Sequence, residues 1–349
     1  MVAGRLGPRI ESAGAMPILP FAEATAPTRI DLAGGTLDIW PVYLFHPGAV
    51  TVNVAIDRRA WCRVETGHAG VRIESKDTLA QTEGATVTDV LGGGALALVA
   101  FILRALGIES GVKVVTHSRV PAGSGLGGSS ALAVTIAAAA SAAMGRPLDP
   151  EGLWPIVRDA ECQAIAVPTG VQDYLAAIHG GVLGIALEPG ALRTARLETD
   201  PGRVEESLLL VDAGATRFSG INNWEVFKGQ IDGDAGVRAA LARIVAAARS
   251  LREALLAARY ADVPALMAAE WDARKALAPG VTTPEVDRIV EIARQGGGAA
   301  KVCGAGGGGM VAVWADVDKK GAIDSALRAA GFKTVPFRID LRGLEVETD

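Results

Sequence analysis

The residues best suited to chemistry in this chain form a glycine- and serine-rich segment at 121–131, with the sequence PAGSGLGGSSA. Successive glycines let backbone N–H groups converge on a bulky anion, and a helix starting here adds its positive dipole end. The hydroxyls of Ser129 and Ser130 can cap that helix or coordinate Mg²⁺. We therefore predict a phosphate-binding loop. The residues expected to contact a phosphate-containing cofactor are Pro121, Gly123, Ser124, Gly125, Leu126, Gly127, Gly128, Ser129 and Ser130.

The same loop allows three other interpretations. Gly123, Gly125 and Gly128 satisfy the GxGxxG pattern of dinucleotide sites, but no acidic residue stands about 20 positions on at the end of a second strand. A Walker loop requires GK[ST], and the segment contains no lysine. The last alternative is a tight glycine turn whose serines only cap the next helix. The flanking strand and helix favour the phosphate-binding interpretation.

Two further segments, 26–38 (APTRIDLAGGTLD) and 169–175 (TGVQDYL), contain candidate catalytic groups. An arginine such as Arg29 presents a fork of donors to oxyanions, and a carboxylate such as Asp38, just past a Gly-Gly turn, can accept two adjacent hydroxyls. The carboxylate of Asp173 could orient a hydroxyl group and accept its proton. By themselves, Arg29 and Asp173 would be interpreted as a surface ion-pair partner and a helix N-cap.

A second glycine-rich segment lies at 301–310 (KVCGAGGGGM), where a backbone can press against a nucleotide or fold under a substrate. A simple β-turn is the alternative, but such a density of glycine at the mouth of an apolar strand costs folding entropy. Glu161 is a further candidate for Mg²⁺, although we expect it to be a carboxylate on a helix surface.

These segments are positioned by alternating strand-like and helix-like stretches, which predict an α+β or α/β protein. The phosphate loop follows a strand at 112–118 and precedes an Ala-rich helix that ends at about Met144, before Gly145 and Pro147. Further strands are expected at 22–32, 50–56, 60–65, 70–75, 182–186, 207–212 and 310–314, and further helices at 95–106, 150–166, 236–259, 261–278 and 284–295, with a short helix within 169–181. The boundary between two domains is expected near residue 188.

The segment PAGSGLGGSSA resembles the second signature of the GHMP kinases (galactokinase, homoserine kinase, mevalonate kinase and phosphomevalonate kinase), which wraps the ATP phosphates. The resemblance runs from Ala26 to about Trp314 and includes all three family signatures in order. It implies a two-domain α+β fold, with a ribosomal-S5-like N-terminal domain and a ferredoxin-like C-terminal domain, and ATP and Mg²⁺ as cofactors. One departure is Gly128, where the family usually has a serine. Ser129 then aligns with the residue that helps to hold the metal.

The resemblance also implies roles for single residues. Asp173 becomes the catalytic base, and Arg29 the partner that keeps it ionised and stabilises developing charge. The glycine loop at 301–310 steadies the phosphate loop from the second domain. The residues expected to bind the substrate are Asp38, Gly34, Gly35, Thr36, Arg217, Gly306 and Gly307.

Within the family, the motifs are most similar to those of D-glycero-D-manno-heptose 7-phosphate kinase and related sugar 1-kinases. The similar features include Gln172-Asp173, the segment 216–219 and the segment 271–279. The implied activity is transfer of the γ-phosphate of Mg·ATP to a hydroxyl of a sugar or sugar phosphate. Heptose kinases typically have the sequence Gly-Gly-Gly-Thr-Asp in this segment. This chain has Gly-Gly-Thr-Leu-Asp at 34–38, so Thr36 is shifted by one position and one glycine is missing. The alternatives are a kinase for a non-sugar alcohol (mevalonate or homoserine type) and a catalytically silent ligand-binding relative.

Composition limits the partners. The net charge of −5 gives no reason to expect a nucleic acid, and no apolar stretch is long enough for a bilayer. The three scattered cysteines form no CxxC pair, which favours a cytoplasmic protein. We expect a monomer or homodimer with a leader at 1–20 that is disordered or over-annotated, an ATP-binding domain at 21–188 and a second domain at 189–349.

Overall fold

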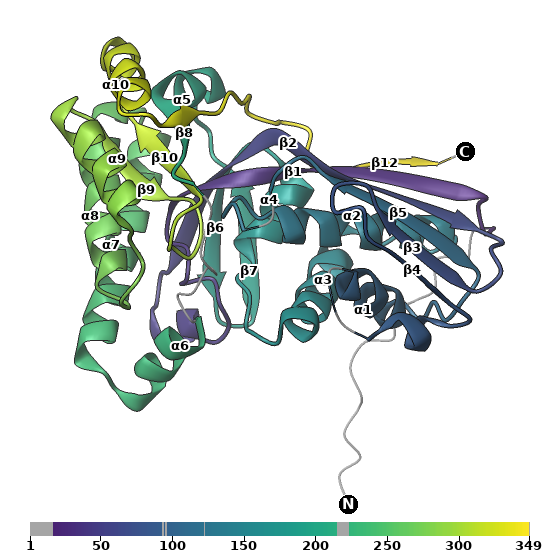
Figure 1. Ribbon diagram of the computed structural model, residues 1–349. Helices are drawn as coiled ribbons and strands as arrows, with labels where there is room; N and C mark the ends of the chain where they lie inside the picture. Colours follow the sequence, from purple (N-terminus) through teal and green to yellow (C-terminus); the bar gives the residue numbers. More distant parts are fainter. Residues whose placement is uncertain (1–16, 93, 95, 122, 215–222, 349) are drawn as a thin grey trace, which may run out of the picture.

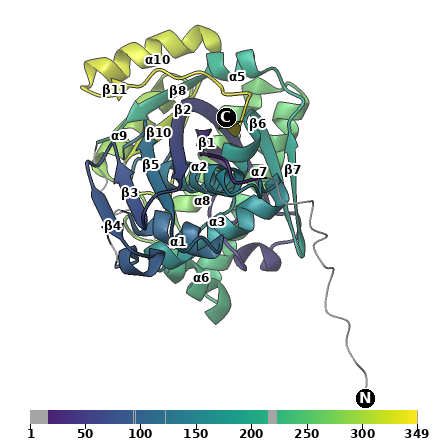
Figure 2. The same ribbon diagram turned by 90° about the vertical axis from the view of Figure 1, so that its right-hand side faces the viewer.

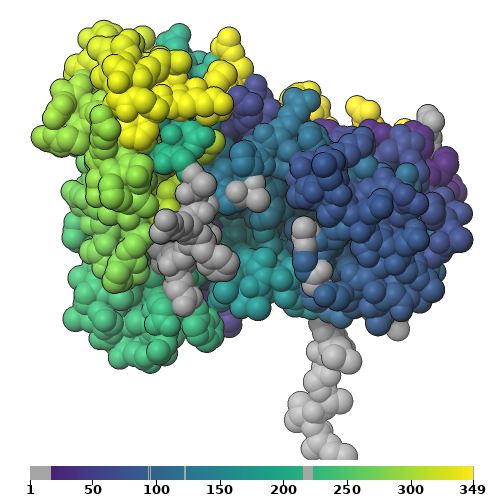
Figure 3. Space-filling model, viewed as in Figure 1, coloured from purple at the N-terminus to yellow at the C-terminus, as the bar shows by residue number. Residues whose placement is uncertain are grey.

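The chain folds into two lobes, each built around its own β-sheet (Figure 1). The computed structural model describes residues 17–92, 94, 96–121, 123–214 and 223–348. In the space-filling view, a groove separates the blue N-terminal lobe from the green and yellow C-terminal lobe (Figure 3).

The first lobe contains an eight-stranded sheet in the order β12-β1-β2-β5-β3-β4, to which β6 and β7 are added beside β2. Its strands are β1 (Phe21–Ala33), β2 (Val50–Thr66), β3 (Val71–Ser75), β4 (Gln81–Gly84), β5 (Val112–Ser118), β6 (Val182–Glu188), β7 (Ala191–Arg196) and β12 (Glu345–Thr348). The two strands expected at 50–56 and 60–65 are one strand, β2. Its register with β1 shifts between Pro27 and Thr28, so the chain continues through a bulge and does not turn.

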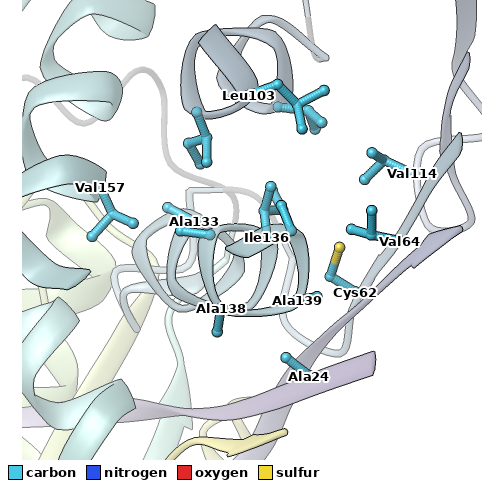
Figure 4. Packing of buried hydrophobic residues seen from close by; sticks show 14 of the residues in the cluster. Ala24, Cys62, Val64, Leu103, Val114, Ala133, Ile136, Ala138, Ala139 and Val157 are labelled. Atoms are coloured by element: carbon cyan, nitrogen blue, oxygen red, sulfur yellow. The ribbon is translucent and has the colours of Figure 1, made fainter. Parts of the chain in front are cut away.

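Four helices cover one face of this sheet, with α2 at their centre (Figure 2). They are α1 (Ala97–Ala105), α2 (Gly128–Ala143), α3 (Pro150–Ile165) and α4 (Gln172–His179). A helix that is apolar on all sides must be buried on all sides, and the alanines of α2 let its neighbours approach closely. Figure 4 shows Ala133 and Ile136 of α2 between Leu103 of α1, Val157 of α3 and Val64 of β2. The phosphate loop therefore leads into the most enclosed helix of the lobe.

The second lobe contains a four-stranded sheet in the order β11-β8-β10-β9. Its strands are β8 (Leu208–Asp212), β9 (Ala299–Val302), β10 (Met310–Trp314) and β11 (Lys333–Thr334), and its helices are α5 (Pro201–Ser207), α6 (Asn223–Asp232), α7 (Ala235–Leu256), α8 (Val263–Lys275), α9 (Pro284–Gln295) and α10 (Val317–Ala329). A short 3₁₀ turn at Tyr260–Asp262 connects α7 to α8, and two more, at Val42–Phe45 and Val87–Val90, belong to the first lobe. The helix expected at 236–259 ends at Leu256, because Ala258 takes a left-handed conformation with φ of 53°.

The two lobes share hydrophobic core. Ile30 and Val52 of the first sheet belong to one buried cluster with Leu210 and Trp314 of the second. The domain boundary near residue 188 stays a prediction, but the first sheet continues beyond it into β7 and takes up β12 from the end of the chain (Figure 1). Among the described residues, no helix is long and apolar enough to cross a membrane.

Candidate active site

Arg29, in β1, joins three segments that are far apart in the chain. Its Nε donates to Oδ1 of Asp173 at 2.7 Å, and its Nη1 donates to the backbone carbonyls of Gly125 at 2.5 Å and Cys303 at 2.9 Å. The Arg29 side chain is only 6% exposed, so these acceptors satisfy a cation that has little contact with water. The predicted base, the phosphate loop and the second glycine-rich loop therefore meet at one guanidinium group.

The phosphate loop turns through three left-handed glycines before α2 begins. Gly123, Gly125 and Gly127 have φ angles of 74°, 77° and 71°, which residues with a side chain rarely adopt. A Cβ atom at Gly128 would lie 2.5 Å from Cγ2 of Val120, so a side chain at this position would require Val120 to move. Leu126 is buried, and its carbonyl accepts from the backbone N–H of Arg29 at 3.0 Å.

Glu161 is not on a helix surface, so that expectation was wrong. It is 3% exposed, because α3 turns this face toward the start of α2 and toward α4. Its carboxylate accepts from the hydroxyls of Ser129, Ser130 (2.8 Å) and Tyr174 (2.6 Å). The two serines bond to this carboxylate, and no side-chain cap is formed at α2. Burial raises the pKa of Glu161, although the three hydroxyls oppose that shift.

Asp38 positions the helix that carries the predicted base. Its Oδ2 accepts from the backbone N–H of Gln172 at 2.9 Å, at the start of α4. A Cβ atom at Gly170 would lie 2.2 Å from the same oxygen, so this close approach requires glycine. Burial raises the pKa of Asp38 to about 7, although the Gln172 N–H group opposes that shift. Burial also raises the pKa of Asp173, and Arg29 opposes the rise without cancelling it.

A buried group of four charges lies beside Arg29, and our sequence analysis missed it. Nζ of Lys301 lies 2.9 Å from Oδ2 of Asp31 and 3.2 Å from Oε1 of Glu270. Arg274 pairs with Glu270 and donates to the hydroxyl of Thr36 at 3.1 Å and to the carbonyl of Gly35 at 3.0 Å. Two signals were available: Asp31 shares a strand face with Arg29, and Glu270 stands one helical turn before Arg274.

The second glycine-rich loop lies directly against the phosphate loop. A Cβ atom at Gly304 would be 2.8 Å from Cα of Gly125, and the N–H of Met310 donates to the carbonyl of Ser124 at 2.8 Å. Gly306 and Gly307, expected to bind substrate, lie instead against Val281: the N–H of Gly307 donates to its carbonyl at 2.9 Å.

Two adjoining pockets open around Arg29. The inner pocket, about 180 Å³, is bounded by the turn at 35–39, the start of α4, Glu161 and Arg274. The outer pocket, about 480 Å³, is bounded by the phosphate loop, β5 and the start of α1. Residues that line both are Arg29, Ser129, Asp173, Gly304 and Ala305.

The predicted residues divide between these pockets. Those lining the outer pocket are Pro121, Gly123, Ser124, Gly125, Gly127, Gly128 and Ser129. Those lining the inner pocket include Gly35, Thr36, Asp38 and Ser130. Gly34, Gly306 and Gly307 line neither, and Arg217 lies outside the described residues. Gly304 and Ala305 line both pockets; they belong to the loop predicted at 301–310 but were not named individually as site residues.

The fold and the site define a class of protein. It is a two-lobed α+β protein in which a glycine-rich loop between a strand and a helix faces a partly buried Arg–Asp pair. Residues 91–181 match the GHMP kinases N terminal domain, and residues 251–333 match the GHMP kinases C terminal domain. The chain belongs to the GHMP kinase family, which confirms the predicted family and fold class.

Individual relatives have different acceptors in their names. The chain is 27% identical over 316 residues to the D-glycero-alpha-D-manno-heptose 7-phosphate kinase of Campylobacter jejuni, covering 86% of this chain and 91% of that protein. It is also 27% identical over 356 residues to the mevalonate kinase of Thermococcus sibiricus, covering 93% and 98%. The crystal structure of a D-glycero-D-manno-heptose 1-phosphate kinase from Bacteroides thetaiotaomicron has a TM-score of 0.74 and 22% identity, covering 94% of this chain and 99% of that one.

Proposed function

We propose that this protein transfers the γ-phosphoryl group of Mg·ATP to a hydroxyl of a sugar or sugar phosphate, as a heptose 7-phosphate kinase does. The observation that carries the proposal is that the inner and outer pockets meet at Arg29 and Asp173. An alcohol in the inner pocket and a nucleotide phosphate in the outer pocket would lie on either side of one carboxylate. This is the arrangement that proton removal and phosphoryl transfer require.

The charges of the inner pocket favour a sugar over mevalonate as acceptor. Four carboxylates line this pocket, against two guanidinium groups, and both of these are already paired with carboxylates. The substrate carboxylate of a mevalonate-type enzyme needs a cation that is free to receive it, and the described part of the pocket offers none. Hydroxyl groups, which donate to carboxylates without bringing charge, match this lining better. By the same argument, the phosphate group of a sugar phosphate would have to lie outside the described part of the inner pocket.

The residues around Glu161 fit Mg²⁺. Mg²⁺ prefers oxygen ligands and is commonly held by one or two carboxylates together with substrate phosphates. Glu161 and the hydroxyl of Ser129 supply such oxygens beside the phosphate loop. Glu161 is buried and has no cationic partner among the described residues, so a metal ion would supply the missing positive charge. When bound, Mg²⁺ neutralises charge on the phosphates.

The residues of the chain then divide the work of the reaction. Asp173 accepts the proton of the attacking hydroxyl as that oxygen bonds to the γ-phosphorus and the bond to the ADP oxygen breaks. A pKa raised by burial makes Asp173 a stronger base than an exposed aspartate. Arg29 keeps this carboxylate in place, and the N–H groups of the phosphate loop stabilise charge on the transferred group.

The first test is ATP consumption with Mg²⁺ against sugars, sugar phosphates, mevalonate and homoserine. We expect turnover on a sugar compound, and a kcat roughly 10²- to 10⁴-fold lower in Asp173→Asn with nucleotide binding retained. Asp272→Asn, which alters an exposed ion pair with Lys275, is the matched control and should keep full activity. Turnover on mevalonate or homoserine would overturn the sugar acceptor. Nucleotide binding without turnover on any acceptor would favour a silent relative.

A further inference from the structure

The side-chain amide of Gln172 is the unexplained polar group of the inner pocket. Gln172 is 5% exposed and lines this pocket, yet its side-chain oxygen Oε1 is buried without a hydrogen-bond partner. The other polar side chains of the described residues that line the pocket, such as those of Arg274 and Thr169, have hydrogen-bond partners. A buried amide without a partner costs stability, so its retention needs a reason.

A missing partner alone does not define a site. Both amide atoms of Asn53 in β2 are also buried without partners, but Asn53 does not line the inner pocket. Gln172 differs because it lies at the first position of α4, directly before the proposed base Asp173. Both residues line the same pocket, so a molecule held against Asp173 is also within the surroundings of the Gln172 amide.

The turn that contains Gly35 packs closely against the side chain of Gln172. A Cβ atom at Gly35 would lie 2.9 Å from Nε2 of Gln172 and 2.5 Å from Oδ2 of Asp31. The turn can therefore lie this close to both side chains only because residue 35 is a glycine. Asp31 also has an unpartnered oxygen, Oδ1, and lines the same pocket. Oε1 of Gln172 and Oδ1 of Asp31 are thus two buried oxygens without partners, on residues that line the same pocket.

We propose that Gln172 is a specificity-determining residue that hydrogen-bonds a second hydroxyl of the acceptor, distinct from the hydroxyl that is phosphorylated. This inference rests on the proposed sugar kinase activity and names one contact that selects its substrate. A carboxamide both donates and accepts, so it can pair with a hydroxyl in either sense. Because Gln172 lines the inner pocket, an acceptor that lies in this pocket can bring such a hydroxyl to its side chain. An acceptor without a second hydroxyl at this place leaves the amide unpaired and binds more weakly.

The test uses Gln172→Met, which keeps the length of the side chain and removes both hydrogen-bonding groups. The acceptors are D-galactose, L-fucose and D-glycero-D-manno-heptose 7-phosphate. We expect the KM for the acceptor that turns over to rise roughly 10- to 100-fold, with the KM for ATP unchanged. The melting temperature should stay the same or rise, because the substitution removes an unpartnered buried amide. A purely structural role predicts the opposite change in melting temperature.

Gln230→Met is the matched control, since Gln230 is 3% exposed and lies in α6 outside the pocket, where it bonds to His46. This variant should keep the acceptor KM. An unchanged acceptor KM in Gln172→Met would overturn the inference and leave the proposed function standing. A lower stability together with a higher KM for ATP would have the same meaning. Calorimetry with the same three sugars gives a readout without turnover. A parent protein that neither binds nor phosphorylates any of them would overturn the proposed function together with this inference.

Discussion

Three carboxyl groups around the inner pocket have raised pKa values: Asp38, Glu161 and Asp173. The main cause is the same for all three, because burial disfavours the charged form of each group. Their surroundings differ, however: Asp38 accepts from a backbone N–H, Glu161 from three hydroxyls and Asp173 from an arginine. Perturbed carboxyl groups that share one pocket are typical of catalytic sites.

Asp38 should make the stability of the protein depend on pH in a defined direction. Its pKa is about 7 in the folded protein and near 3.8 ordinarily, so between these values the folded state binds a proton that the unfolded chain releases. The stabilisation from this proton is fully present below about pH 4 and is lost as the pH rises through about 7. We expect the free energy of unfolding, from urea titrations, to fall less between pH 5 and 8 in Asp38→Asn than in the parent.

The difference between the two proteins isolates Asp38, because Glu161 and Asp173 contribute in the same direction to both. Asparagine can still accept the N–H of Gln172, so the start of α4 should be preserved. Parallel pH dependences for parent and variant would contradict the raised pKa of Asp38.

At the scale of the elements, the contact between the two glycine-rich loops is expected to fix the position of the phosphate loop. Gly304 has no space for a Cβ atom because the backbone of Gly125 lies 2.8 Å away. We expect Gly304→Ala to push the phosphate loop out of position and to raise the Kd for ATP at least roughly tenfold, which corresponds to about 1.4 kcal/mol. Calorimetric titration with ATP measures this.

Gly321→Ala is the control for this substitution. Gly321 lies within α10, and nothing stands within 4 Å of the place where its Cβ would be. Alanine is a better helix former, so the control should gain about 0.5–1 kcal/mol of stability and leave ATP binding unchanged. Equal losses of ATP affinity in both variants would indicate that the loop contact is unimportant.

A feature could be predicted from the sequence when the residues that form it lie close together in the chain. The phosphate loop, the turn at 34–38 and Asp173 lie in short segments whose glycines and charged residues are recognisable locally. Glu161 is different, because its neighbours in the chain read as an ordinary helix face. Its role depends on α2 and α4, which bring Ser129 and Tyr174 to it. The inward face of α3 follows from packing, and periodicity alone did not identify it.

Over the whole molecule, buried charges connect the two lobes. Asp31 belongs to β1 of the first lobe, whereas Glu270 and Lys301 belong to α8 and β9 of the second. Burial would raise the pKa of Glu270, but Arg274 and Lys301 outweigh it and lower that pKa. The pairing was not predicted, because residues some 270 positions apart meet only in the folded chain.

Removing one of these charges should be costly. Lys301 is fully buried, so Lys301→Met leaves Asp31 and Glu270 with Arg274 as their remaining cation. We expect the free energy of unfolding to fall by about 3–5 kcal/mol, measured by urea denaturation at pH 7. Lys319→Met removes an exposed partner of Asp316 and should cost less than about 1 kcal/mol. Similar values for the two variants would show that the buried group does not hold the lobes together.

The contact between Gly125 and Gly304 also constrains how relatives of this protein can exchange parts. Gly125 belongs to the first lobe and Gly304 to the second, and each leaves space only for the backbone of the other. A hybrid gene that joins the first half of one kinase to the second half of another inherits these two surfaces from different parents. Such hybrids should bind nucleotide only where both parental loops have the same shape, so the two loops are expected to change together during divergence.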